Sequence, residues 1–202
     1  MIKKMLNNPT LWNLSRYFLD ITWGLYRKRI AFLQDLGIFS DNPSVLEIGC
    51  GSGLFADITK GHYVGIDSNC RIINYANKRK YKGKKIFRCV GLKVLEKEKA
   101  MFDIILIVDV LHHLDDKNCI DLLKNSARLT KKYLVSYDCV LREKVNVIQK
   151  WFMKHDNGAN FRYLGEFNKL FQAAGYKIVR THDIQLGCLT THFTLCCLDK
   201  NY

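Results

Sequence analysis

Three glycines and two carboxylates in the first third of the chain have the types and spacing of a ligand site. Gly49, Gly51 and Gly53 follow a short apolar run and alternate with small residues. Because glycine lacks a Cβ, the backbone there can turn sharply and approach a ligand closely. Glu47 stands just before this loop, and Asp67 ends the next apolar run, 20 residues further along. These residues predict a strand, a ligand-binding loop and the start of a helix.

The first carboxylate indicates which ligand fits the loop. A dinucleotide-binding loop spaces its glycines as G-x-G-x-x-G, but here Leu54 takes the third position and the last glycine is Gly53. Glu47 would oppose a pyrophosphate, because like charges repel strongly in a poorly hydrated site. It suits an ammonium or sulfonium group, and S-adenosylmethionine carries both. Asp67 fits a carboxylate that holds ribose hydroxyls at the end of the next strand. The alternative is a glycine-rich turn without a ligand.

A second polar group follows the continuous apolar run of residues 104–108, which predicts a central parallel strand. Asp109, His112 and His113 come after it, where open α/β sheets bind their ligands. Histidine titrates near neutrality, so His112 is a candidate proton acceptor, and Asp109 is the second candidate catalytic residue. The alternative is structural, with one histidine packed under the ligand and the other capping the next helix, and we favour it for His113. The spacing matches no metal-binding signature.

Glu47, the glycine loop and Asp67, together with residues 102–114, resemble the class I (Rossmann-like) S-adenosylmethionine-dependent methyltransferases of the small-molecule type. The resemblance implies an α/β fold, with a seven-stranded, mostly parallel sheet, one antiparallel strand and helices on both faces. It also implies that Glu47 orients the methionine amino group, while Asp67 holds the ribose hydroxyls. The residues that it assigns to the cofactor are Glu47, Gly49, Cys50, Gly51, Gly53, Asp67, Ser68, Leu92 and Val108.

One position departs from the family pattern. Many members carry an acidic residue after the third strand, which hydrogen-bonds the adenine amino group, but this chain has Gly91 and Leu92 there. A backbone group or a water molecule would then contact the adenine. The departure keeps open a non-enzymatic alternative, a methyltransferase-fold protein that binds a partner without catalysis. The intact Glu47, glycine loop and Asp67 argue against that alternative.

Further polar residues lie where the resemblance places the acceptor. Residues 133–138 predict the fifth strand, and Asp138 ends it at the carboxyl edge of the sheet. The polar segment 155–162 follows the next predicted helix, and in the family this insertion usually shapes the acceptor pocket. Arg162 could clamp a phosphate or carboxylate, unless it pairs with Asp156 in a self-contained turn. The residues predicted on the substrate side are His113, Asp138, His155, Asp156 and Arg162.

The acceptor class is narrowed by motifs that the sequence does not contain. Methyltransferases that act on exocyclic amines or on C5 of nucleic-acid bases use Pro-Pro or Pro-Cys motifs, whereas this chain has only Pro9 and Pro43. We therefore expect transfer to an oxygen or nitrogen of a small molecule, a sugar or a lipid headgroup. The net charge of +13 and the basic segment 77–85 favour an anionic partner and keep RNA methylation open as an alternative. A solvated helix end is the simpler interpretation of that segment.

The length of 202 residues favours a single domain that spans residues 1–202. We expect an N-terminal helical extension in 1–40 and the core of the domain in 44–199. We expect a cytoplasmic protein, because the sequence has neither an 18-residue apolar run nor a signal-peptide pattern. Eight scattered cysteines without a C-x-x-C pair predict free thiols and no zinc site. The sequence gives no signal for the oligomeric state. Further predicted elements are helices near 54–60, 70–81, 116–129, 143–153 and 163–174, and strands near 62–66, 85–90, 176–180 and 193–198.

Overall fold

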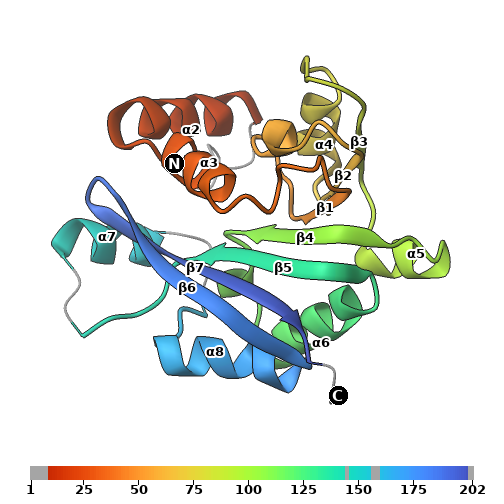
Figure 1. Cartoon of the computed structure of the whole chain (residues 1–202). Coiled ribbons are helices and arrows are strands. Elements are labelled where there is room, and N and C mark those ends of the chain that lie inside the picture. Colours follow the sequence, from red (N-terminus) through yellow and green to blue (C-terminus); the bar gives the residue numbers. More distant parts are fainter. Residues whose placement is uncertain (1–8, 144–145, 156–159, 200–202) are drawn as a thin grey trace.

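The computed structural model describes residues 9–143, 146–155 and 160–199. Seven strands form one sheet in the order β3-β2-β1-β4-β5-β7-β6 (Figure 1). Strands β1 to β5 run parallel, and β7 is antiparallel to both of its neighbours. This arrangement confirms the predicted sheet with one antiparallel strand. The strands are β1 (Val45–Ile48), β2 (Tyr63–Ile66), β3 (Lys85–Arg88), β4 (Phe102–Val108), β5 (Thr130–Asp138), β6 (Tyr176–Leu186) and β7 (Leu189–Leu198).

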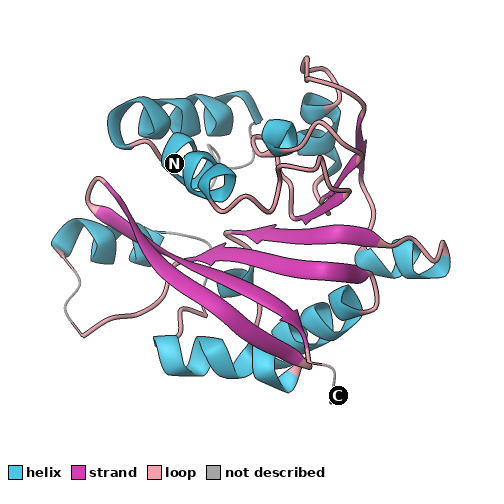
Figure 2. Cartoon of the chain, in the orientation of Figure 1, coloured by secondary structure: helices cyan, strands magenta, loops and turns pink. Residues whose placement is uncertain are grey.

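Helices cover both faces of the sheet (Figure 2). Gly24, with a φ of +72°, separates the first two helices, because glycine adopts this backbone conformation without strain. In the part of the chain that the structure describes, no helix is long and apolar enough to cross a lipid bilayer. The helices are α2 (Pro9–Trp23), α3 (Arg27–Asp35), α4 (Cys70–Ala76), α5 (Leu92–Lys97), α6 (Asp116–Ala127), α7 (Val147–His155) and α8 (Leu164–Ala173), with short 3-10 helices η1 (Ala56–Ile58) and η2 (Leu111–His113).

Alternation of side chains along the strands gives the sheet two buried cores. On β1, Leu46 and Ile48 pack with residues of α5, α6 and α8. Val45, one position away, packs on the opposite face with residues of α3 and α4. Because both faces of the central strands are covered, these strands are apolar along most of their length. The carboxyl ends of the parallel strands carry the polar residues that the sequence assigns to the site.

Several predicted elements differ in extent from the structure. The predicted helix at 54–60 is wrong, because only the 3-10 turn η1 forms there. Thr59 is already extended, and its hydroxyl donates to the Pro43 carbonyl at 2.8 Å. Helix α5 was not predicted, since its two buried leucines, Leu92 and Leu95, are too few to establish a helical period. The hairpin of β6 and β7 is longer than predicted and turns at Gly187, whose φ is +58°.

The prediction that all eight cysteines are free thiols is wrong for one pair. Cys70 and Cys89 form a disulfide with a Cα–Cα distance of 5.0 Å. Cys70 begins α4, shortly after β2, and Cys89 directly follows β3. The two neighbouring parallel strands bring the cysteines together, although 19 positions separate them in the sequence. The remaining six cysteines are free.

Candidate active site

The glycine loop lies at the carboxyl end of β1, between the ends of β2 and β4. The amides of Gly49 and Cys50 both donate to the Ile66 carbonyl, at 2.8 and 3.0 Å, which fixes the loop to the neighbouring strand. The three loop glycines have φ between +52° and +74°, a region that side chains rarely allow. A Cβ on Gly53 would lie 2.6 Å from the Phe87 ring. Both the backbone angles and the packing therefore require glycine here.

Asp67 lies at the carboxyl end of β2 and braces the glycine loop. Its Oδ2 accepts from the Gly51 amide at 3.0 Å, and its Oδ1 accepts from the Asn69 amide at 2.8 Å. A carboxylate has about four acceptor positions, so two remain for other donors. The side chain is partly exposed and Ser68 beside it is exposed. This arrangement fits a carboxylate that also accepts from two neighbouring ribose hydroxyls.

On the predicted adenine side, the backbone at Gly91 is open and the apolar side chains are buried. Val108 ends β4 and Leu92 begins α5, and both side chains are almost fully buried. A Cβ placed on Gly91 would meet no atom within 4 Å. The backbone at Gly91 is therefore accessible at the position where many family members carry an acid. This geometry fits a planar ring that is contacted by the main chain.

Glu47 is buried beneath the glycine loop, where its carboxylate accepts a hydrogen bond from the Tyr63 hydroxyl. Burial raises the pKa of Glu47 to about 8, although the hydrogen bond from Tyr63 acts in the opposite direction. A buried carboxylate with such a pKa gains stability from a nearby cation. Glu47 therefore fits the methionine ammonium, directly or through water. Tyr63 could not be predicted as part of the site, because in the sequence it is an ordinary apolar strand residue.

Asp109, predicted as catalytic, forms a bidentate ion pair with Arg29 of α3. The Arg29 Nη1 and Nη2 atoms lie 2.7 and 3.1 Å from the Asp109 carboxylate oxygens. Burial raises the pKa of Asp109, but the Arg29 guanidinium outweighs it and holds that pKa below its usual range. Arg29 is almost fully buried and also donates to the Thr191 hydroxyl at 3.1 Å. Asp109 is thus suited to anchor α3 over the site and poorly suited to accept a proton.

Arg29 itself was missed by sequence reasoning. It follows Arg27 and Lys28, and such a basic run reads as a solvated helix face. The structure instead turns Arg29 inward, where Nη2 reaches β7, and its carbonyl accepts from the Tyr137 hydroxyl at 3.1 Å. The helical extension is therefore connected to three strands of the sheet by one arginine.

His112 and Asp138 form a buried pair at the carboxyl ends of β4 and β5. The His112 Nδ1 atom lies 2.5 Å from Asp138 Oδ1. Asp138 also accepts from the backbone amides of Leu111 and Cys139, both at 2.8 Å. The His112 ring stacks on Phe161 with the centroids 5.1 Å apart and the planes 8° from parallel. Asp138, predicted on the substrate side, therefore contacts and orients His112, the residue predicted as the base.

Arg162, predicted to clamp an anion, is buried and engaged within the protein. Its Nε donates to Asp116 at 2.6 Å, and its two Nη atoms donate to the carbonyls of Leu111, Leu114 and Asn160. These hydrogen bonds hold the segment that begins at Asn160 against the η2 turn, which carries His112. The structure thus gives Arg162 a positioning role in place of the predicted anion clamp.

The other predicted substrate residues lie at the margin of this group. The His113 side chain is exposed, and its ring centroid lies 4.1 Å from that of His112. His155 ends α7, is exposed, and its Nδ1 lies 2.8 Å from the Trp151 carbonyl. Asp156 lies outside the described residues, so the predicted pairing of Asp156 with Arg162 also falls outside them.

Comparison with known proteins decides the family. Residues 20–181 match the model of a methyltransferase domain family. This chain belongs to that family. The ubiquinone biosynthesis O-methyltransferase of Coxiella burnetii (strain Dugway 5J108-111) is 29% identical over 170 residues, covering 75% of this chain and 70% of that protein. Other curated relatives of the same name are matched over less than half of their length.

Two solved methyltransferases share the fold. The magnesium protoporphyrin IX methyltransferase of Synechocystis PCC 6803, solved with S-adenosylhomocysteine, has a TM-score of 0.66 and 17% identity, with 84% of this chain and 80% of that chain covered. Human N-acetylserotonin methyltransferase, solved with S-adenosylmethionine, has a TM-score of 0.71 and 15% identity, with 97% and 58% covered.

This methyltransferase uses S-adenosylmethionine, the cofactor of its family. The site described above fits that molecule in two ways. Glu47 offers a buried carboxylate to the ammonium group, and Asp67 retains acceptor positions after bracing the loop. The exposed backbone at Gly91 leaves room for a main-chain contact with the adenine, whereas the side chains of Leu92 and Val108 are buried in the two different cores. The assignment of each contact remains a prediction from the motif.

Proposed function

We propose that this methyltransferase transfers the methyl group of S-adenosylmethionine to a hydroxyl oxygen of a small molecule, with His112 as the general base. The observation that carries the proposal is the 2.5 Å contact between His112 Nδ1 and Asp138 at the carboxyl edge of the sheet. The related proteins named ubiquinone biosynthesis O-methyltransferase support oxygen as the atom that receives the methyl group.

The Asp138 carboxylate selects the tautomer of His112. A carboxylate beside Nδ1 holds the ring proton on that nitrogen, and the basic lone pair then resides on Nε2. Asp138 is fully buried and is held by backbone amides on both sides, so its orientation is fixed. Stacking on Phe161 fixes the plane of the imidazole. The orientation of the imidazole is therefore fixed before any acceptor arrives, with Nε2 buried in this structure.

The strength of the histidine base limits which acceptor hydroxyls can be deprotonated. A hydroxyl attacks the methyl carbon well only when its proton leaves, and histidine titrates near pH 6.5. A phenolic hydroxyl, with a pKa near 10, lies within reach of such a base. We therefore propose a phenol-type acceptor. We do not propose an anionic one, because the arginine predicted to clamp an anion binds Asp116 and three carbonyls.

The other site residues hold the reactants. When bound, S-adenosylmethionine supplies an electrophilic methyl carbon on its sulfonium sulfur. Glu47 holds the amino group of the cofactor, the glycine loop lies along its chain, and Asp67 holds the ribose. The ion pair between Arg29 and Asp109 keeps α3 over the carboxyl edge of the sheet. These contacts position the two reactants and exclude water, which is most of what a methyl transfer requires.

An acceptor panel tests the proposal. The purified protein is incubated with radiolabelled S-adenosylmethionine and matched phenols, catechols, anilines and aliphatic alcohols, and products are identified by mass spectrometry. We expect methylation of the phenols or catechols, and little or none of the amine analogues. Preferred methylation of the amines would contradict the proposal. The variant His112→Asn tests the role of the base in the same assay. Its matched control is His62→Asn, because His62 is an exposed histidine before β2.

A further inference from the structure

Helix α2 carries an apolar stripe that faces away from the protein. Leu14, Tyr17, Phe18 and Ile21 recur at positions i, i+3, i+4 and i+7, the spacing of one helix face. Such a stripe normally packs against a core, yet these four side chains are 56–65% exposed. The residues of the opposite side of the helix, such as Leu19 and Trp23, are partly buried. The helix thus turns an apolar face outward.

A basic segment lies at the same end of the molecule. Residues 77–85, which connect α4 to β3, contain six lysine and arginine residues and no acidic residue. Helix α2 lies against α4, and both α2 and this connection occupy the upper part of the molecule in Figure 1. Among the described residues, none of the six cations forms an ion pair with a carboxylate. The charge of the segment is therefore not neutralised within the described protein.

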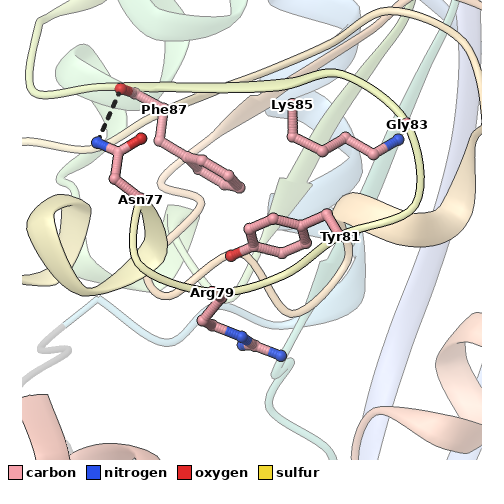
Figure 3. A pocket seen from close by; sticks show the side chains of 6 residues that line it. All are labelled: Asn77, Arg79, Tyr81, Gly83, Lys85 and Phe87. Carbon is pink, nitrogen blue, oxygen red and sulfur yellow. Dashed lines mark hydrogen bonds between the residues drawn. The ribbon is translucent and has the colours of Figure 1, made fainter.

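The cavity in this segment is too small to explain the charge. It has a volume of about 190 Å³, below the roughly 300 Å³ at which small-molecule pockets begin. Figure 3 shows the Tyr81 ring between the side chains of Arg79 and Lys85. Arg79 donates to the Ser52 carbonyl at 3.0 Å, and Lys85 donates to the Thr59 carbonyl. The cations do not converge on one point, so they suit an extended anionic surface better than a single small anion.

We propose that the α2 stripe (Leu14, Tyr17, Phe18 and Ile21) and the basic segment 77–85 together dock on an anionic phospholipid membrane. Amphipathic helices with exposed aromatic and aliphatic side chains lie in the membrane interface, and neighbouring cations add attraction to anionic headgroups. The proposal concerns location and does not rest on the identity of the acceptor.

Charge distinguishes this occupant from the alternatives. A second copy of the chain would bring two proteins of net charge +13 together at their most basic segments, and like charges repel. A nucleic acid would neutralise the cations but would leave the apolar stripe of α2 exposed to water. An anionic bilayer satisfies both features, because apolar side chains enter the interface while the cations meet the headgroups.

Vesicle flotation tests the proposal. The protein is mixed with phosphatidylcholine vesicles that contain either no or about one third phosphatidylglycerol, and the bound fraction is measured. We expect binding only to the anionic vesicles, and weaker binding when salt rises from about 0.1 M to about 1 M. Phe18→Ser is expected to lower the partition coefficient at least about ten-fold, and Lys80→Ala about five-fold.

Matched controls keep the test specific. Val179→Ser removes a similarly exposed apolar side chain on β6, and Lys177→Ala removes an exposed cation of the same strand. Both are expected to bind vesicles like the unmodified protein, and all variants should retain its melting temperature and its affinity for S-adenosylhomocysteine. Equal losses in the controls, or no binding to anionic vesicles, would overturn the proposal. So would a concentration-dependent dimer that Phe18→Ser abolishes, or RNA binding in place of vesicle binding.

Discussion

Asp109→Asn removes the carboxylate that balances the buried guanidinium of Arg29. Because the Arg29 side chain is only 2% exposed, the variant leaves a charge that water cannot reach, and we expect a loss of about 3–5 kcal/mol in the free energy of unfolding. Arg29→Met has a smaller effect, about 2 kcal/mol, because the abandoned Asp109 carboxylate is 29% exposed and can bind water. The asymmetry between the two variants follows directly from their burial.

Denaturant unfolding of the two single variants and the double variant measures the coupling energy between Arg29 and Asp109. Since the two side chains share two hydrogen bonds, the double variant should be more stable than the sum of the single losses predicts, by about 1–3 kcal/mol. The folded pKa of Asp109 is depressed, so this contribution is present above the unfolded pKa near 4 and is lost as the pH falls through the lower, folded pKa. Additive losses within error, or Arg29→Met less stable than Asp109→Asn, would refute the reasoning.

Three further predictions concern the cofactor side. The pKa of Glu47 in the folded protein is raised to about 8, so the unmodified protein should lose stability relative to Glu47→Gln as the pH rises from about 4 to about 8, by up to about 1.4 kcal/mol per pH unit. Denaturant unfolding of both proteins at the two ends of this range measures the change. A stability difference that does not vary with pH would contradict the prediction. Cys70→Ser opens a 19-position disulfide loop and should lower the free energy of unfolding by about 3 kcal/mol, whereas Cys188→Ser, at a free cysteine, should not. Gly53→Ala should abolish S-adenosylhomocysteine binding in calorimetry because its Cβ meets a ring at 2.6 Å, while Gly165→Ala in α8, with open space around it, should bind normally.

The sheet and the glycine loop could be predicted because their signals are local. Residues 104–108 are a continuous apolar run, and residues 45–48 are apolar except for Glu47; such runs are typical of strands that are covered on both faces. The three loop glycines occur where the backbone requires positive φ. The split of the N-terminal helices at Gly24 has the same origin. In each case, the residue type and the backbone constraint lie at the same position.

The roles of several polar residues could not be predicted, because their partners are distant in the sequence. Arg29 meets Asp109 across 80 positions, and Arg162 meets Asp116 across 46. The disulfide between Cys70 and Cys89 depends on the pairing of β2 with β3. Only the fold brings these groups together, so a pattern read along the chain cannot distinguish a buried pair from two solvated charges.

Single-turnover methyl transfer with His112→Asn tests the central claim most directly. The cofactor is preloaded, an acceptor hydroxyl from the panel is added, and the rate of methyl transfer is compared with that of the unmodified protein and of His62→Asn. We predict that His112→Asn lowers the rate about 10²–10⁴-fold while S-adenosylhomocysteine affinity stays unchanged, because a general base contributes that much to the transition state. Transfer by His112→Asn at the unmodified rate would contradict the assignment of His112 as the base.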